Sequence, residues 1–555
     1  MTEIQIAQSV TPRHIREIAT KLAIPEEKLE YYGNDKAKIP LDIIDEEKVK
    51  ANNLILVTAI TPTPPGEGKT TTSIGLVDAL NILNKKAVAV IREPSLGPVF
   101  GIKGGAAGGG WSQVIPMVDI NLHFTGDFHA IEKANNLLSA LIENNIQSKS
   151  RSLGIDPRTV VWKRCMDMND RALRNIVSAL GGKAGGVPRE TGFNITAASE
   201  IMAILCLASG LEDLKERCGN IYVGDTWEGK PVFAKDLNAE GAMAVLLKDA
   251  IKPNLVQTLE GNPAIIHGGP FANIAQGTNS IVATKMGMTL SDYTVTEAGF
   301  GSDLGAEKFL NIKCRAAGIS PKTIVLVATI RALKYHGGKS LKEITQEDVE
   351  ALKKGLPNLE GHIASLKSFG IPIVVSINAF KSDTEAEMQV VEDHCEKMGI
   401  PVALSYGWEN GGNGCLALAG EVIKAANSCT DQFHPTYNLD DNVHTKMEKI
   451  CQTIYGGKNV VLSDVAISQL RKYEAMGYGS LPVCMAKTEK SFSDDQKLLG
   501  RPKNFDIHIR EFEIATGAGF IIPIAGNMLR MPGLPATPAA EKITIDKNGV
   551  IEGLF

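Results

Sequence analysis

The stretch Thr61-Pro-Thr-Pro-Pro-Gly-Glu-Gly-Lys-Thr-Thr-Thr72 decides the fold, because it lies between an apolar run, Leu54–Ile60, and a helical pattern, Ser73–Leu83. A strand, a glycine-bearing loop that ends in Gly-Lys-Thr and then a helix form the setting in which a chain cradles phosphate. Loop amides and the free N–H groups of the new helix would point at a polyphosphate. Lys69 would reach its β- and γ-phosphates, and Thr70 would bind Mg²⁺.

The match to the phosphate-loop pattern G-x-x-x-x-G-K-[ST] is incomplete, because Thr63 occupies the first glycine position. A second near-match, Gly224–Lys230, is followed by Pro231 where Ser or Thr belongs, and its flanks at 220–223 and 232–234 predict a hairpin. We therefore assign phosphate binding to the first segment. The alternative for that segment is an ordinary loop that starts a helix.

Composition indicates a large globular protein. The chain has 555 residues, of which 44% are hydrophobic and 22% charged, values typical of soluble proteins with several domains. A net charge of −5 and the lack of a dense Lys/Arg run argue against a nucleic-acid partner. No signal peptide or membrane span is predicted. The nine cysteines include no CxxC pair, so we expect neither a zinc site nor disulfides, and a cytoplasmic location.

Short β-rich runs alternate with helical segments from residue 54 onward. The runs are 54–60, 87–91, 323–329, 371–377 and 401–405. Uninterrupted runs of this kind suit strands that are buried on both faces of a parallel sheet. Their alternation with helices predicts a doubly wound, mostly parallel α/β sheet that contains the phosphate loop (P-loop).

The alternation of β-rich runs with helical segments is interrupted between about residues 140 and 290, and the stretch 196–209 there predicts a helix. We expect three domains. They are a nucleotide-binding domain formed by 1–140 and 290–360, an inserted domain formed by 140–290, and a C-terminal α/β domain formed by 360–555.

Two features after the second run indicate anion binding. Arg92 leaves the run Ala87–Ile91 at the edge where the phosphate loop leaves the first run, if these two strands are neighbours. An arginine there can clamp a phosphate or carboxylate, and the alternative is a salt bridge with an acid such as Glu93. The stretch Gly101–Trp111 has five glycines in seven residues, which suits close approach of backbone to a ligand. A flexible linker would contain Ser and Thr as well, and Lys103 favours an anion.

Aromatic side chains follow the last two runs. Phe380 comes after Ile371–Ile377, together with Asn378 and Asp383, and Trp408 comes after 401–405. Two rings at neighbouring strand ends would sandwich a planar ligand. The alternative is that the rings cover a seam between domains.

Two further pairs leave both a functional and a structural interpretation open. Arg331 and Lys334 would share one face of a helix after 323–329, where they would either bind an anion or lie in solvent. His123 and His129 are six residues apart and match no zinc spacing, so we favour a hydrogen-bonded loop over a metal site.

These segments together resemble the formate–tetrahydrofolate ligase family. The resemblance covers nearly the whole chain and is most specific in Gly101–Trp111 and Val327–Gly338. Its other segments are 61–72, 92–98, 267–273, 296–303 and 531–535. The glycine loop of the family usually ends in Tyr, and here it ends in Trp111. Thr63 at the first glycine position is itself usual in the family.

The resemblance implies a three-domain subunit, a homotetramer and the conversion of ATP, formate and tetrahydrofolate to ADP, phosphate and 10-formyltetrahydrofolate. Formyl phosphate would be the intermediate, and a monovalent cation (K⁺ or NH₄⁺) would assist. Lys69 would act on the transferred phosphate, Thr70 would hold Mg²⁺, and Arg92 would bind formate and then formyl phosphate.

Further site residues follow from the resemblance. The residues expected to contact ATP are Thr63, Pro64, Pro65, Gly66, Glu67, Gly68, Lys69 and Thr70. Those expected to hold formyl phosphate are Gly104, Gly105 and Gly108. The folate rings would lie between Phe380 and Trp408, with Leu404 nearby. Asp127 and His129 are the candidates for the base that deprotonates N10.

Two other functions would also use a phosphate loop. Another ATP-dependent ligase, acting on a carboxylate such as a biotin precursor, would tend to be far shorter and would lack the glycine-rich stretch. An ATPase that switches partner binding would usually need a Cys/His cluster or an exposed apolar groove, and neither is evident. ATPase activity measured with and without formate and tetrahydrofolate separates all three.

Overall fold

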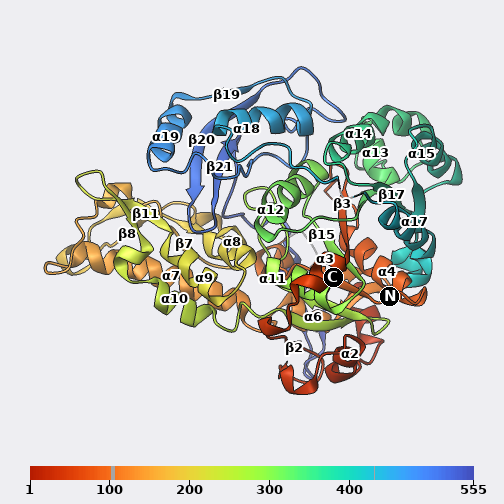
Figure 1. Ribbon diagram of the computed structural model, residues 1–555, viewed down its shortest axis with the longest axis horizontal. Coiled ribbons are helices and arrows are strands. Elements are labelled where there is room, and N and C mark those ends of the chain that lie inside the picture. Colours follow the sequence, from red (N-terminus) through yellow and green to blue (C-terminus); the bar gives the residue numbers. More distant parts are fainter. Residues whose placement is uncertain (65, 102–106, 431, 555) are drawn as a thin grey trace.

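One large sheet organises the molecule (Figure 1). The computed structural model describes residues 1–64, 66–101, 107–430 and 432–554. Within these residues, neighbouring strands run parallel across most of the sheet. In spatial order the parallel strands are β14 (Pro263–Ile266), β4 (Ala87–Ile91), β15 (Tyr293–Glu297), β3 (Asn53–Ala59), β16 (Thr323–Ala328), β17 (Ile373–Asn378) and β18 (Val402–Ser405). The expected α/β class with a large, mostly parallel sheet is therefore confirmed.

Beyond β14 the sheet continues with antiparallel strands. They are β13 (Asn254–Thr258), β2 (Ala37–Lys38) and β1 (Glu30–Tyr31), with β6 (Ser112–Ile115) paired to β13 and β5 (Gly108–Gly109) paired to β6. This edge brings the end of the glycine-rich stretch onto the sheet.

Both faces of the parallel strands are buried, which explains their uninterrupted apolar sequences. Because side chains alternate along a strand, Leu54 and Leu56 of β3 join one hydrophobic cluster, whereas Ile55 and Val57 join another. Helix α14 (Val349–Lys367) packs into the first cluster. Helices α4 (Lys69–Ile82) and α17 (Leu416–Asn427) pack into the second.

The expectation that β3 and β4 are neighbours is wrong. β15 lies between them and pairs with both. Its sequence, Tyr-Thr-Val-Thr-Glu, is too polar to stand out as an apolar run, yet Thr294 and Thr296 are fully buried. The carboxyl ends of β3, β15 and β4 still meet at one edge, because the three strands are parallel.

Two lobes flank the sheet (Figure 1). One contains α7 (Asp127–Gln147), α8 (Glu200–Leu207), α9 (Leu211–Gly219), α10 (Glu240–Leu247) and the hairpin of β11 (Tyr222–Asp225) and β12 (Pro231–Phe233), which confirms the predicted hairpin. The other places α18 (Val443–Ile450) and α19 (Asp464–Ala475) beside β19 (Val460–Leu462), β20 (Ile507–Ala515) and β21 (Phe520–Ala525). No helix in the described parts of the chain is both long and apolar enough to cross a bilayer.

The remaining elements connect these parts. The helices are α1 (Glu3–Gln8), α2 (Ile15–Lys21), α3 (Glu46–Ala51), α5 (Leu96–Phe100), α6 (Met117–Asn121), α11 (Ile281–Leu290), α12 (Arg315–Ala317), α13 (Ile330–His336), α15 (Glu385–Lys397) and α16 (Gly407–Asn410). The short strands are β7 (Arg164–Cys165), β8 (Ile176–Ser178), β9 (Arg189–Thr191), β10 (Phe193–Asn194), β22 (Thr544–Ile545) and β23 (Ile551–Glu552).

The helix predicted at 196–209 is shorter than expected. The hydroxyl of Ser199 accepts a hydrogen bond from the Met202 amide at 3.2 Å and caps α8, so the α-helix begins at Glu200. The main sheet also crosses the expected domain boundaries at 290 and 360. It takes β13 and β14 from one side of the first boundary, and β17 and β18 from the far side of the second. The division into three domains stays a prediction.

Candidate active site

The loop between β3 and α4 has the backbone geometry of an anion cradle. Gly66 and Gly68 have φ angles of +85° and +74°, which L side chains rarely adopt. Gly68 is also the N-cap of α4, and no side chain caps the helix there. A helix N-terminus that no side chain caps is a setting in which backbone amides can bind an anion.

A buried acid holds this loop in place. The Glu67 side chain accepts hydrogen bonds from the amide and hydroxyl of Thr63, at 2.7 and 2.8 Å, and from the hydroxyl of Thr329 at the end of β16. The Asn378 amide donates to the Glu67 carbonyl at 3.1 Å. A Cβ on Gly68 would lie 2.2 Å from the same Asn378 side chain. The Glu67 carboxylate thus shapes the loop from inside the protein.

Glu297 connects the start of α4 with Arg92. It is the last residue of β15, is 1% exposed, and accepts a hydrogen bond from the Thr70 hydroxyl at 2.8 Å. Its other oxygen lies 3.6 Å from the Arg92 guanidinium. Lys69 and Thr70 are the first two residues of α4. The residues predicted to act on phosphate, to hold Mg²⁺ and to bind formate therefore lie at the same edge of the sheet.

A glycine makes room for the Arg92 side chain. A Cβ on Gly299 would lie 2.9 Å from the guanidinium, which also donates to the Pro270 carbonyl at 3.4 Å. The Arg92 Nε is buried, and among the described residues no acceptor bonds to it. Next to Gly299, Phe300 has a φ of +56°, an unusual value for a bulky side chain. Strain of this kind clusters at functional sites.

The described end of the glycine-rich stretch lies against α4 and Trp408. Lys103, Gly104 and Gly105 fall outside the described residues. Gly108 has a φ of +91°, and a Cβ there would lie 2.7 Å from Ile74 of α4. A Cβ on Gly110 would lie 1.9 Å from the Trp408 carbonyl oxygen. A side chain at Gly108 would thus meet the Ile74 side chain, and one at Gly110 would meet the Trp408 backbone, so both positions favour glycine.

The two aromatic residues predicted to bind folate have different surroundings. The Phe380 ring lies 3.5 Å below the Arg331 guanidinium, a cation–π contact. The Trp408 side chain is 36% exposed, and its indole N–H donates to Glu3. Among the described residues no ring contact joins Phe380 to Trp408. Leu404 of β18 is partly buried and packs against the larger core.

Arg331 and Lys334 do not act as a pair. Lys334 is fully buried in an ion pair with Glu387 at 2.8 Å and donates to the Gln346 carbonyl. Both open interpretations of Lys334, anion binding and surface solvation, are therefore wrong. Arg331 alone faces an aromatic ring.

Asp127 and His129, the two candidates for the base that deprotonates N10, have different surroundings. The Asp127 carboxylate is buried, pairs with Lys38 at 2.8 Å and accepts from the Asn254 amide at 2.8 Å. Its oxygens are thus already engaged. His129 is stacked on His123 and hydrogen-bonded to it at 3.0 Å.

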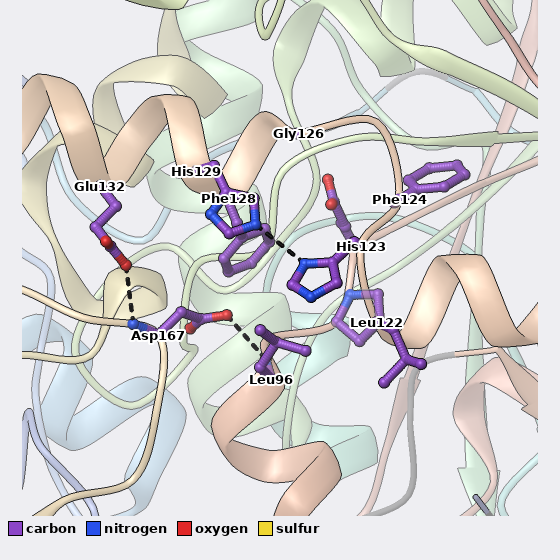
Figure 2. Close-up of a pocket in the computed structure, with 11 residues that line it drawn as sticks. Leu96, Leu122, His123, Phe124, Gly126, Phe128, His129, Glu132 and Asp167 are labelled. Carbon is purple, nitrogen blue, oxygen red and sulfur yellow. Dashed lines mark hydrogen bonds between the residues drawn. The ribbon is translucent and has the colours of Figure 1, made fainter. Parts of the chain in front are cut away.

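The two histidines line a small hollow (Figure 2). Three carboxyl groups share this hollow, those of Glu93, Glu132 and Asp167. Burial, followed by the charge of Asp127, raises the pKa of Glu93 well above its usual range, and burial raises the pKa of Asp167 to about 6. In the parts of the chain that the structure covers, no group of three metal-ligating side chains is arranged to bind a metal ion.

Sequence reasoning missed Glu297 and Phe300 as residues of this site. The rule that found Arg92, a functional side chain at the carboxyl end of a buried strand, applies equally to Glu297. It was not applied because the strand that ends there has too few apolar residues. Phe300 and Glu297 both lie in the segment 296–303, which carries part of the family resemblance, but the positive φ of Phe300 depends on the surrounding fold and has no sequence pattern.

A model of one protein family matches the entire chain. The family is described as formate–tetrahydrofolate ligase, and the match covers residues 1–555. The matched region includes the phosphate loop, Arg92 and both aromatic residues. The chain therefore belongs to the formate–tetrahydrofolate ligase family, whose members are enzymes that join formate to tetrahydrofolate at the expense of ATP.

Proposed function

We propose that this enzyme activates formate as formyl phosphate and transfers the formyl group to N10 of tetrahydrofolate. One observation supports the proposal most strongly. The Glu297 carboxylate touches both the Thr70 hydroxyl and the Arg92 guanidinium, so a nucleotide-binding loop and an anion-binding arginine belong to one cluster. In this account Thr61–Thr72 is a P-loop on a doubly wound sheet.

Formate is a resonance-stabilised anion and a poor electrophile, so it needs activation. In the first step a formate oxygen forms a bond to the γ-phosphorus of ATP, and the bond to ADP breaks. Both reactants are negative, and fixed positive groups must offset their repulsion. Lys69 stabilises the transferred phosphoryl group, and Arg92 holds formate in line with it.

The start of α4 and the end of β15 together offer oxygen ligands that suit a magnesium ion. Mg²⁺ prefers oxygen ligands, and the Thr70 hydroxyl and Glu297 carboxylate lie 2.8 Å apart. These two side chains would hold the ion directly or through its waters, and the ion would neutralise charge on the β- and γ-phosphates. The protein would thus supply two metal-ligand oxygen atoms, from Thr70 and Glu297, next to Lys69 in the sequence of α4.

In the second step N10 of the folate attacks the formyl carbon, the bond from that carbon to the phosphate oxygen breaks, and the N10 proton passes to the released phosphate or to solvent. Phe380, Leu404 and Trp408 hold the folate rings, because aromatic faces stack favourably and add buried apolar area. Amides of the glycine-rich stretch, at Gly104, Gly105 and Gly108, keep the labile anhydride in place meanwhile. The Asp127 carboxylate is already engaged by Lys38, so we no longer favour it as the base.

A monovalent cation fits the surroundings of Glu93. The Glu93 Oε2 atom is buried and has no hydrogen-bond partner among the described residues. Asp127 lies close enough to disfavour the charged form of Glu93. A K⁺ or NH₄⁺ ion bound there would favour the charged form of Glu93, one residue away from Arg92.

We also propose that the enzyme is a cytoplasmic homotetramer. Cysteines in the described chain are free, as expected for a reducing compartment. Val177 and Leu180 are exposed apolar side chains close together in the sequence, and they are candidates for a subunit contact. Light scattering coupled to size-exclusion chromatography measures the assembly directly.

The proposed reaction is tested by measuring ADP release from ATP. We expect ADP release to require formate, and sustained release to require tetrahydrofolate as well, together with formation of 10-formyltetrahydrofolate. ADP release that ignores both small molecules would favour a nucleotide switch instead. Release with another carboxylate in place of formate would favour a different ligase.

A further inference from the structure

One side chain of the N-terminal helix α1 contacts two elements of the proposed site. The Glu3 Oε1 atom accepts a hydrogen bond from the Trp408 indole at 3.0 Å. Its Oε2 atom accepts from the Gly110 amide at 2.5 Å and from the Gln113 side chain at 3.1 Å. A single carboxylate thus joins the residue proposed to stack on folate to the end of the glycine-rich stretch.

The helix that carries Glu3 is itself firmly anchored. Thr2 and Gln5 form a reciprocal capping box at its N-terminus. Ile4 and Ile6 are buried in the same hydrophobic cluster as one face of the central sheet. Because the helix cannot shift without exposing these side chains, the Glu3 carboxylate has a fixed position.

Backbone contacts already hold the two elements together. The Trp111 amide donates to the Trp408 carbonyl at 2.9 Å, and the Ser112 hydroxyl donates to the Gly407 carbonyl at 2.8 Å. These bonds fix the main chain around Trp408 but leave its side-chain torsions free. The indole N–H is the only polar group on that ring, so its bond to Glu3 determines the orientation of the ring plane.

We propose that Glu3 is a positioning residue for tetrahydrofolate, which orients the Trp408 ring before the folate binds. A ring that is already ordered loses less conformational entropy when a ligand stacks on it. Hydrogen bonds to a carboxylate are stronger than those between neutral groups, which suits this task at a half-exposed position. The inference rests on the proposed role of Trp408 in folate binding.

Glu3→Gln in the full-length enzyme tests the proposal. Glutamine has the same size but offers one acceptor oxygen to three converging donors. We expect the KM for tetrahydrofolate to rise about ten-fold, which is the factor for loss of one charge-assisted hydrogen bond, while the KM for ATP and formate changes less than about two-fold. Glu17→Gln is the matched control, since Glu17 is an exposed acid in the first turn of α2.

A second variant separates positioning from general stability. Trp408→Phe keeps a ring but removes the indole N–H. In that background Glu3→Gln should add less than about a two-fold change in the KM for tetrahydrofolate, because the bond it breaks is already absent. A full ten-fold effect there would overturn the proposal, as would an unchanged KM in the single variant or equal rises for all three substrates.

The same assays distinguish this inference from the proposed function. If the unmodified enzyme shows no turnover that depends on tetrahydrofolate, the proposed function itself fails. If the unmodified enzyme is active and Glu3→Gln leaves its KM for tetrahydrofolate unchanged, only the role of Glu3 is lost.

Discussion

Around the start of α4, buried charged groups hold one another in place, whereas the ends of β17 and β18 lead into partly exposed rings. Glu67 and Glu297 are each 1% exposed and accept hydrogen bonds from neighbouring strands and loops. Trp408 is 36% exposed. The two regions lie on one sheet. Buried charged groups form the first region, and partly exposed aromatic rings form the second.

This difference matches the two steps of the proposed reaction. Phosphoryl transfer between anions needs charges that are fixed before the substrates arrive, because their reorganisation would add to the barrier. Folate binding needs apolar area and ring stacking, which tolerate small movements. Changes in the first region should therefore lower kcat, and changes in the second should raise the KM for tetrahydrofolate.

The largest effect is expected from Arg92→Ala. The variant removes the group that we propose offsets repulsion between formate and ATP, so kcat should fall by about 10²–10³-fold, the cost of losing one aimed donor. Steady-state kinetics measure kcat, and calorimetry should show ATP binding close to normal. Arg158→Ala is a control, since Arg158 pairs with Asp156, away from the start of α4 and in the lobe that contains α7 and β11. Near-normal turnover would remove Arg92 from the mechanism.

Glu297→Gln should have a smaller effect in the same region. The substitution keeps the shape but removes the charge that faces both Thr70 and Arg92. We expect kcat to fall about 10–100-fold, as for other groups that orient a metal site, and the Mg²⁺ concentration for half-maximal rate to rise. Titration of activity with Mg²⁺ measures both. A lower kcat with an unchanged Mg²⁺ requirement would mean that Glu297 serves Arg92 alone.

Phe380→Ala tests the aromatic region. Loss of the ring removes stacking and buried area, which together should raise the KM for tetrahydrofolate about ten-fold. The KM for ATP should stay the same, because the phosphate loop is held by Glu67 rather than by the ring. Trp227→Ala, at an exposed position in the hairpin of the other lobe, is a control. A fall in kcat without a change in KM would contradict the separation of the two regions.

The smallest effect concerns the pH dependence of stability. Burial, with a further contribution from Glu260, raises the pKa of Asp78 on α4 to about 7. The folded protein therefore keeps a proton on Asp78 that the unfolded chain loses near pH 4, and stability falls as the pH rises from about 4 through about 7. Asp78→Asn removes this term. Its Tm relative to the unmodified enzyme should be higher at pH 8 than at pH 5.5, and an equal difference at both pH values would contradict the prediction.

Much of the fold was predictable because the apolar runs carry a strong signal. Strands β3, β4, β16, β17 and β18 were each found within two residues of their observed ends. β15 was missed, since Thr and Glu replace the apolar residues that mark a buried strand. That omission led to the wrong pairing of β3 with β4, because strand order depends on every member of a sheet.

The site was predictable where function follows from local sequence. Lys69, Thr70 and Arg92 were predicted to lie at one sheet edge because loop and strand-end residues follow simple rules, and their roles stay predictions. Glu67 was expected to contact ATP, but burial turns its carboxylate towards Thr63 and Thr329. The contact between Glu3 and Trp408 joins residues from opposite parts of the chain. No local pattern reports such a contact, because only tertiary packing creates it.

The most direct test of the central claim follows ¹⁸O from labelled formate during turnover. If Lys69 and Arg92 bring formate and the γ-phosphate together to form formyl phosphate, one labelled oxygen must appear in the inorganic phosphate that is released. Mass spectrometry of the phosphate detects it. Phosphate that carries no label while 10-formyltetrahydrofolate accumulates would contradict the account, because formate would then never have bonded to phosphorus.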